Sequence, residues 1–259
     1  MSADDRVAGR TALVTGAGNG LGRAIAHALS GAGARVVLTG RTRATLDGVA
    51  AELAGAAAGV RVAVCDTSDP DSVAALHREL ADEHVSVLVN NAGIAGPVDA
   101  LVDIEPDDWD EVFAVNVRGV YLMCRAFLPA MTAAGRGDVI NIASVSGKRP
   151  LARRTPYTAS KMAVLGLTVT LAHEVGTLGV AVNSLSPGPV AGPRMARNFR
   201  LEAQRTGVTE AEAEHAFVSR AALQRMVTEE EVGAAVVAML RMPGMTGADV
   251  DLSAGMIAR

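Results

Sequence analysis

The sequence predicts a single doubly wound α/β domain, with about seven parallel strands and helices on both faces of the sheet. Apolar runs of strand length alternate with helical patterns along the whole chain, which is the pattern of βαβ units. The chain of 259 residues, 49% of them hydrophobic, can bury one large core. No linker, repeat or low-complexity tract divides it, so residues 1–259 are expected to form one domain.

The expected strands are short runs rich in β-branched residues, at residues 12–14, 35–39, 61–64, 85–89, 139–142, 180–185 and 249–252. The expected helices lie at residues 23–32, 44–53, 71–83, 108–134, 156–178 and 229–240. Thr228 with Glu231, and Thr209 with Glu212, have the spacing of capping boxes, which mark two helix starts.

The start of the helix at 156–178 carries the main candidate chemistry. Tyr157 and Lys161 are four residues apart and therefore share one helix face. A tyrosine pKa of about 10 is lowered by a nearby ammonium, so the pair suits a general acid/base at neutral pH. The alternative is a half-buried aromatic ring beside a solvated lysine. Thr155 is expected to cap this helix, with Pro156 as its first residue and Gly179 at its end.

A glycine-rich turn joins the first strand to the first helix, reading Thr15-Gly-Ala-Gly-Asn-Gly-Leu-Gly22. The common G-x-G-x-x-G fingerprint does not fit, because Leu21 occupies its third glycine, and no Gly-Lys-Ser/Thr of a nucleotide triphosphatase follows. The spacing G-x-x-x-G-x-G, at Gly16, Gly20 and Gly22, does fit. Such a turn lets the backbone and the helix N-terminus approach a pyrophosphate.

Composition and charge exclude several classes of protein. The net charge is −4 and no basic run exceeds two residues, so no nucleic-acid partner is expected. The longest uncharged apolar window, residues 162–172, is far short of the roughly 20 residues of a membrane span. The N-terminus carries acids in place of a signal peptide, which indicates a cytoplasmic protein. Cys65, Cys124 and the histidines form no metal spacing, and both cysteines are expected to be packing residues.

The connection at residues 188–227 is longer than a plain crossover requires. Proline and glycine crowd its start, and helical periodicity follows at 198–222. Because ligands of open α/β sheets bind at the carboxyl ends of the strands, this segment is interpreted as a substrate lid. A packing insertion or a subunit interface is the alternative.

The order of these motifs resembles the classical short-chain dehydrogenases/reductases along nearly the whole chain. The resemblance rests on residues 15–22, Asp66, residues 90–93, Asn116, Ser144, Tyr157, Lys161 and residues 187–188. It implies a Rossmann-type fold and hydride transfer between NAD(P)(H) and a carbonyl or secondary alcohol. Two other functions stay open: an epimerase or dehydratase of the extended relatives, and a non-catalytic dinucleotide-sensing protein.

The resemblance also implies a catalytic group. Tyr157 would exchange the proton at the substrate oxygen, while Lys161 lowers its pKa and holds the nicotinamide ribose. Ser144 would donate a hydrogen bond to the same oxygen. Asn116 would hold a water that links Lys161 to solvent, or would instead be a helix-kink residue whose amide bonds nearby backbone.

The cofactor contacts that the resemblance implies include Asp66 at the adenine amino group and residues 90–93 beside the ribose. One departure is that residues 189–193 offer no threonine for the carboxamide, so backbone around Val190 is expected to replace it. The full expected set is Gly16, Gly18, Asn19, Gly20, Leu21, Arg41, Asp66, Thr67, Asn90, Ala92, Gly93, Tyr157, Lys161, Pro187, Gly188 and Val190.

The end of the second strand favours NADP(H) over NAD(H). Gly40 stands where an acid would accept the ribose hydroxyls of NAD, and no acid follows until Asp47. Arg41 and Arg43 could instead bind a 2′-phosphate. Two features oppose this: Asn19 replaces an arginine that often helps, and the arginines could lie in solvent.

The substrate and the assembly are less defined. The basic residues of two segments, Lys148, Arg149, Arg153, Arg154, Arg194, Arg197, Arg200 and Arg205, could attract an anionic small-molecule substrate. Solvated faces or intersubunit ion pairs are the alternative. The apolar faces of the helices at 108–134 and 156–178 suit a homotetramer or homodimer, although they could simply cover the sheet.

Overall fold

In the computed structural model, which describes residues 6–257, seven parallel strands form one sheet in the order β3-β2-β1-β4-β5-β6-β7. They are β1 (Thr11–Thr15), β2 (Arg35–Gly40), β3 (Val60–Val64), β4 (Val85–Asn90), β5 (Gly137–Ile142), β6 (Val180–Pro187) and β7 (Asp249–Leu252). The chain runs from β1 outward to β3 and then returns to the other side of β1 with β4. This reversal opens a crevice at the carboxyl ends of β1 and β4, and it confirms the predicted doubly wound fold.

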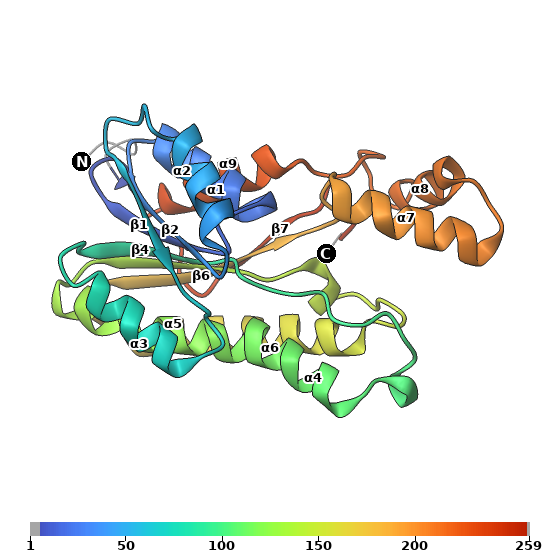
Figure 1. Ribbon diagram of the computed structural model, residues 1–259, viewed down its shortest axis with the longest axis horizontal. Coiled ribbons are helices and arrows are strands. Elements are labelled where there is room, and N and C mark those ends of the chain that lie inside the picture. Colours follow the sequence, from blue (N-terminus) through green and yellow to red (C-terminus); the bar gives the residue numbers. More distant parts are fainter. Residues whose placement is uncertain (1–5, 258–259) are drawn as a thin grey trace.

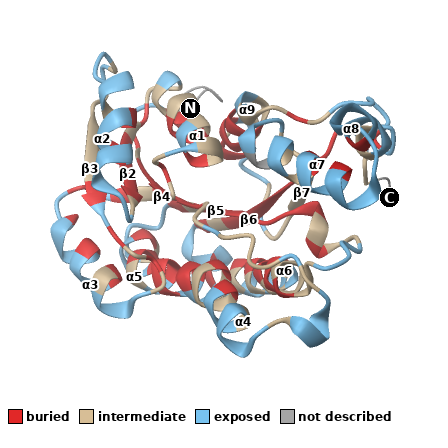
Figure 2. Cartoon of the chain, turned by 45° about the vertical axis from the view of Figure 1, so that its right-hand side comes forward, coloured by how far each residue is buried: buried red, intermediate tan, exposed pale blue. Residues whose placement is uncertain are grey.

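Helices cover both faces of the sheet (Figure 1). One face packs against α1 (Gly20–Gly31), α2 (Arg43–Glu52) and α9 (Glu229–Leu240). The other packs against α3 (Pro70–Glu79), α5 (Gly119–Ala133) and α6 (Thr155–Val175). Strand side chains alternate between the two cores: Val14 joins the first and Leu13 the second. Figure 2 accordingly shows buried strands between helices whose outer surfaces are exposed.

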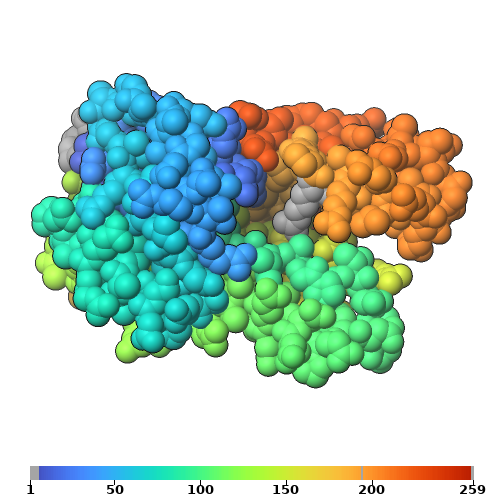
Figure 3. Space-filling view, in the orientation of Figure 1, coloured from blue at the N-terminus to red at the C-terminus, as the bar shows by residue number. Residues whose placement is uncertain are grey.

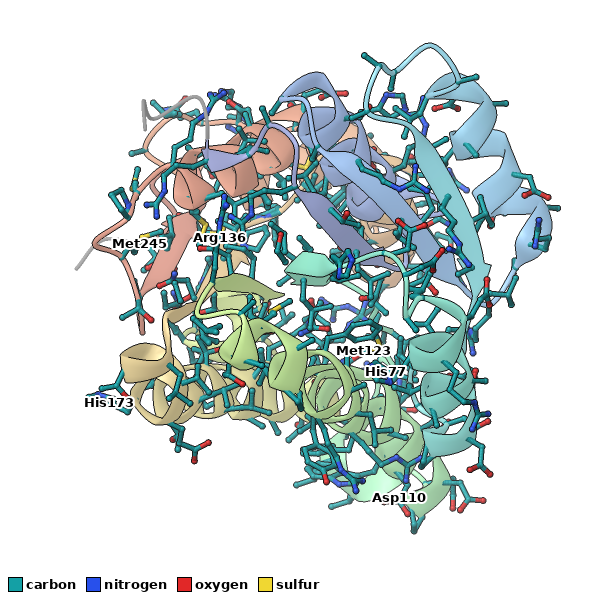
Figure 4. The ribbon with its side chains drawn as sticks, turned by 90° about the vertical axis from the view of Figure 1, so that its left-hand side faces the viewer. His77, Asp110, Met123, Arg136, His173 and Met245 are labelled. Carbon is teal, nitrogen blue, oxygen red and sulfur yellow. The ribbon has the colours of Figure 1, made fainter. Side chains whose placement is uncertain are left out.

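Helix α5 is preceded by α4 (Pro106–Phe113) and a π-helical turn, η3 (Ala114–Arg118). Together they form a run, Pro106–Ala133, that is long and apolar enough to span a membrane, but half of its most apolar window is buried inside the protein. Met123 of this run is buried in the helix layer beneath the sheet, whereas Asp110 and His173 are exposed and point outward (Figure 4). The run is therefore accounted for as a core helix.

Several helix boundaries differ from the expectation. Thr155 does not cap α6: it is the first helical residue, the N-cap position is Arg154, and Pro156 is second. The predicted helix at 108–134 is interrupted by η3. The one predicted at 71–83 runs from Pro70 to Glu79, and Glu83, beyond its end, is bonded to Arg35 and Arg61. Gly179 does end the α6 segment, with φ of 79°. Single turns η2 (Leu101–Asp103), η4 (Val145–Gly147) and η5 (Gly176–Leu178) complete the described elements.

The long connection forms two helices, α7 (Pro193–Thr206) and α8 (Glu210–Val218), which project beyond the sheet (Figure 1). Gly207, with φ of 74°, separates them, and the predicted capping boxes at Thr209 and Thr228 are both present. The pair has its own small core, in which the Phe199 and Phe217 rings meet edge to face at 5.7 Å. These helices stand where a lid over the crevice would lie.

Candidate active site

A cleft of about 1880 Å³ opens at the carboxyl ends of the strands, between the sheet, residues 144–154 and the α7–α8 pair. Figure 3 shows it as a hollow between the blue N-terminal region, the green segment around α4 and the orange α7–α8 pair. All but two of the predicted catalytic and cofactor residues line it. The two that do not are Asn90 and Asn116.

The glycine-rich turn has the features that a dinucleotide requires. Gly16 has φ of 64°, and a Cβ at Gly22 would lie 2.1 Å from the Gly16 carbonyl oxygen, so neither position admits a side chain. The first turn of α1 holds no acidic residue, and the Asn19 side chain does not cap it. Its backbone N–H groups are thus available to an anion in the cleft, which is what a pyrophosphate needs. The residues present therefore fit a nicotinamide dinucleotide.

Asn91, which lies in the expected 90–93 segment but not among the individually expected cofactor contacts, holds this turn in place. Its Nδ2 donates to the carbonyl oxygen of Thr15 at 2.9 Å and to that of Gly16 at 3.3 Å. In return, the Thr15 Oγ1 accepts from the amides of Asn91 and Ala92, each at 2.9 Å. These bonds join the loops after β1 and β4 across the crevice. The sequence feature that could have indicated this role is the pair of adjacent asparagines directly after a strand.

The end of the cleft beside β2 and β3 contains Asp66 and Arg41. Burial raises the pKa of Asp66, but bonds from the Ser68 hydroxyl and amide, with the charges of Arg41 and Arg118, bring that pKa below its usual value. Asp66 is therefore an ionised acceptor at neutral pH. Arg43 does not share this wall, because it pairs with Asp47 on α2 at 3.0 Å.

Ser144, Tyr157 and Lys161 all face the cleft. Ser144 ends the segment after β5, where it is 8% exposed and its Oγ accepts from the Ser146 amide at 3.1 Å. On α6, the Lys161 Nζ lies 5.8 Å from the centre of the Tyr157 ring and donates to the Ile142 carbonyl at 2.8 Å. A buried lysine bonded to β5 is fixed in position, so its charge acts on the tyrosine from a constant place.

Asn116 lies behind this group, in the π-helical turn η3. Its Oδ1 accepts from the Ile94 amide at 2.8 Å, and its Nδ2 donates to the Ile94 carbonyl and to Ser160 Oγ, each at 3.0 Å. Ser160 Oγ in turn donates to the Tyr157 carbonyl at 2.7 Å. These bonds place Asn116 at a helix irregularity with its amide bonded to backbone, and its expected role in holding a water stays a prediction.

Asn90 belongs to the sheet and not to the cleft wall. It is 3% exposed, and its Nδ2 donates to Asn141 Oδ1 at 2.9 Å. Asn141 donates onward to Thr168 Oγ1 on α6, also at 2.9 Å. The chain of amides ties β4, β5 and α6 together below the site, so Asn90 supports the sheet and does not line the cleft where the cofactor contact was expected.

The two cysteines and the acidic residues suggest no metal centre. Cys65 and Cys124 are buried and unpaired, and burial raises the pKa of the Cys124 thiol to about 12. Between residues 6 and 257, no three His, Cys, Asp or Glu side chains gather where they could hold a metal ion.

Comparison with known proteins adds to this geometry. Residues 10–204 match the family model described as short chain dehydrogenase. Galactitol 2-dehydrogenase (L-tagatose-forming) of Cereibacter sphaeroides is 46% identical over 192 residues, which cover 72% of this chain and 73% of that protein. The granaticin polyketide synthase putative ketoacyl reductase 1 of Streptomyces violaceoruber is 38% identical over 229 residues, covering 87% and 84%. A solved actinorhodin polyketide ketoreductase variant with NADPH superposes with a TM-score of 0.89 at 32% identity, covering 99% of both chains.

Proposed function

Because this chain belongs to the short-chain dehydrogenase family and is an NAD(P)-dependent oxidoreductase acting on carbonyl or alcohol groups, we propose that Tyr157, Lys161 and Ser144 perform its chemistry. The observation that carries the proposal is their meeting in one cleft with an uncapped helix N-terminus. Nothing in the site favours a non-catalytic sensor or an epimerase over this function.

A nicotinamide cofactor held in this cleft would supply the hydride that the carbonyl carbon of the substrate receives in the direction of reduction. Negative charge then grows on the carbonyl oxygen, where the Ser144 hydroxyl donates a hydrogen bond and the Tyr157 hydroxyl gives up its proton. The Lys161 ammonium stabilises the resulting phenolate. Oxidation of the alcohol reverses each transfer. Asn116 acts indirectly: it holds the backbone of Ile94 and, through Ser160, the turn of α6 that contains Tyr157.

Tyr157→Phe tests the assignment, because it removes only the hydroxyl that exchanges the proton. The rate of ketone reduction should fall by about 10²–10⁴-fold, while NADPH binding measured by fluorescence titration stays unchanged. Lys161→Ala should reduce both the rate and cofactor affinity. Tyr121→Phe, on the exposed surface of α5, is the matched control. A Tyr157→Phe enzyme that keeps more than about a tenth of the wild-type rate would exclude the assigned role.

We also propose that NADP(H) is preferred, with Arg41 as the group that binds the 2′-phosphate. Support comes from the place of Arg41 on the cleft wall, from Gly40 beside it, and from the pairing of Asp47 with Arg43, which leaves no acid for the ribose hydroxyls of NAD at this loop. Arg41→Ala should raise the KM for NADPH about tenfold or more and leave the KM for NADH unchanged. Arg43→Ala is the control. A wild type that prefers NADH tenfold would refute this preference.

The remaining parts of the proposal concern residues 188–227, assembly and location. We propose that this segment is the substrate lid of a single domain, since α7 and α8 line the cleft. We also propose a cytoplasmic homotetramer or homodimer. Exposed apolar side chains on α5 and α6, among them Tyr121, Met162 and Val169, support an interface there. Sedimentation equilibrium would measure the assembly.

A further inference from the structure

The loop between Ser144 and Tyr157 carries four basic side chains, and the structure separates them by what they contact. Lys148 is 5% exposed and pairs with two carboxylates of β7, Asp249 at 2.5 Å and Asp251. Ser184 and Ser186 donate to the same Asp249. Lys148 is therefore neutralised inside the protein, and it fixes the loop against the β7 edge of the sheet.

Arg153 and Arg154 are also engaged. Arg153 pairs with Asp99 at 2.9 Å across the loop after β4, and both side chains are about half exposed. Arg154 donates to Asn198 of α7 at 3.3 Å and so connects the loop to the lid. For both residues these contacts lie within one chain. The Arg194 side chain lies outside the described residues.

Arg149 differs from its neighbours. It is half-buried, it lines the cleft, and within residues 6–257 no hydrogen bond or ion pair reaches it. The carboxylates on the cleft wall are used elsewhere: Glu202 and Glu212 are bonded within α7 and α8, and Asp66 and Glu229 lie beside the dinucleotide loops. A guanidinium withdrawn from water without a counter-charge is unfavourable, and an anion entering the cleft would relieve this.

We propose that Arg149 is a substrate-binding residue for an anionic group, so that the enzyme acts on ketones or secondary alcohols carrying a carboxylate or a phosphate. The inference rests on the proposed function, since it names the substrate class of the same cleft. A planar guanidinium binds either anion through two parallel hydrogen bonds. The rigid Lys148 anchor one residue earlier fixes the backbone from which Arg149 reaches the cleft.

The position of Arg149 assigns it to the substrate and not to the dinucleotide phosphates. The glycine turn and Arg41 follow β1 and β2, whereas Arg149 follows β5 in a loop held to β7. With strands about 4.8 Å apart, β2 and β5 are separated by roughly 14 Å, and β7 lies farther still in the same direction. Ser144, which bonds the reacting oxygen, opens the same loop. An anion at Arg149 therefore lies on the far side of the reacting carbon from the adenosine.

The test uses pairs of ketones in which one member carries an anionic group and the other is neutral: 3-oxobutanoate with its methyl ester, and dihydroxyacetone phosphate with dihydroxyacetone. In Arg149→Gln, kcat/KM for the preferred anionic ketone should fall roughly 10- to 100-fold, with little change for its neutral partner. Arg149→Lys should recover part of the loss. Arg153→Gln, which removes a paired arginine from the same loop, should leave the ratio within about threefold. The anionic ketone whose kcat/KM falls more in Arg149→Gln shows whether Arg149 binds a carboxylate or a phosphate.

A second readout needs no turnover. The anionic ketone with NADP⁺ forms a dead-end complex, which should raise the Tm of the wild type and not that of Arg149→Gln. The proposal is overturned if both ketones of a pair lose equally, if neither changes, if the wild type prefers the neutral ketones, or if Arg149→Gln weakens NADPH binding. If the wild type binds NADPH but reduces no ketone, the proposed function fails instead.

Discussion

Glu83 provides a prediction whose size follows directly from its contacts. Its carboxylate accepts two bonds from Arg35, at 2.6 and 2.9 Å, and one from Arg61 at 2.9 Å. It thereby links β2, β3 and the turn before β4 at the edge of the sheet. These bonds, with the opposing effect of burial, lower the pKa of Glu83 from 4.5 to about 2. The ionised form is therefore favoured by the folded state.

The sign of the pH dependence follows from this direction. Because the folded pKa lies below the unfolded one, the stabilisation is complete above pH 4.5 and is lost as the pH falls toward 2. The difference between the two pKa values corresponds to about 3 kcal/mol. Glu83→Gln, which resembles the protonated acid, should lower the free energy of unfolding by about that amount at pH 7.

Urea unfolding followed by circular dichroism at pH 7, 5, 4 and 3 measures the effect. The gap between wild type and Glu83→Gln should be constant from pH 7 to 5 and shrink below that. Asp82→Asn is the matched control, because the Asp82 side chain is 78% exposed and pairs with Arg61. This substitution should lower the free energy of unfolding by less than about 0.5 kcal/mol. A gap under about 1 kcal/mol at pH 7, or one that does not change between pH 5 and pH 3, would refute the reasoning.

The remaining predictions concern the loop anchor and the lid. Lys148→Met leaves Asp249 and Asp251 without their shared counter-charge, and should lower the free energy of unfolding, measured with urea, by about 2–4 kcal/mol. Arg43→Met is the control: it breaks an exposed ion pair and should lower the same free energy by less than about 0.5 kcal/mol. A loss under 1 kcal/mol would show that water already solvates the two carboxylates. Amides of α7 and α8, which share only a small core, should exchange faster than those of α5 and slow when cofactor and substrate bind. Exchange equally slow with and without ligands would identify them as a fixed interface.

Strands and helix starts could be predicted from the sequence where a pattern of a few neighbouring residues determines them. Each predicted strand overlaps an observed one. For the central strands β1, β4 and β5 the reason is that a strand buried on both faces must be a continuous apolar run, whereas β3 and β7 are only partly buried. Capping boxes at Thr209 and Thr228 were visible because the bond partners are three residues apart. Thr155 failed as a cap because the helix begins one residue earlier than expected, with Arg154 at the N-cap position and no side-chain capping bond. Capping preference favours threonine, but it does not fix a helix boundary to the exact residue.

Within the site, sequence determined which residues face the cleft, and only tertiary contacts determined what they do there. The glycine turn, Tyr157 and Lys161 are fixed by the geometry of one strand-to-helix turn and one helix face, so their grouping is local. The partner of each charged or amide side chain is not local: Asn116 meets Ile94 from 22 residues away, and Lys148 meets Asp249 from 101. Sequence alone therefore left Lys148 and Arg149 equivalent, as two adjacent basic residues. The fold separates them because, within the part of the chain that the structure describes, it brings two carboxylates to Lys148 and none to Arg149.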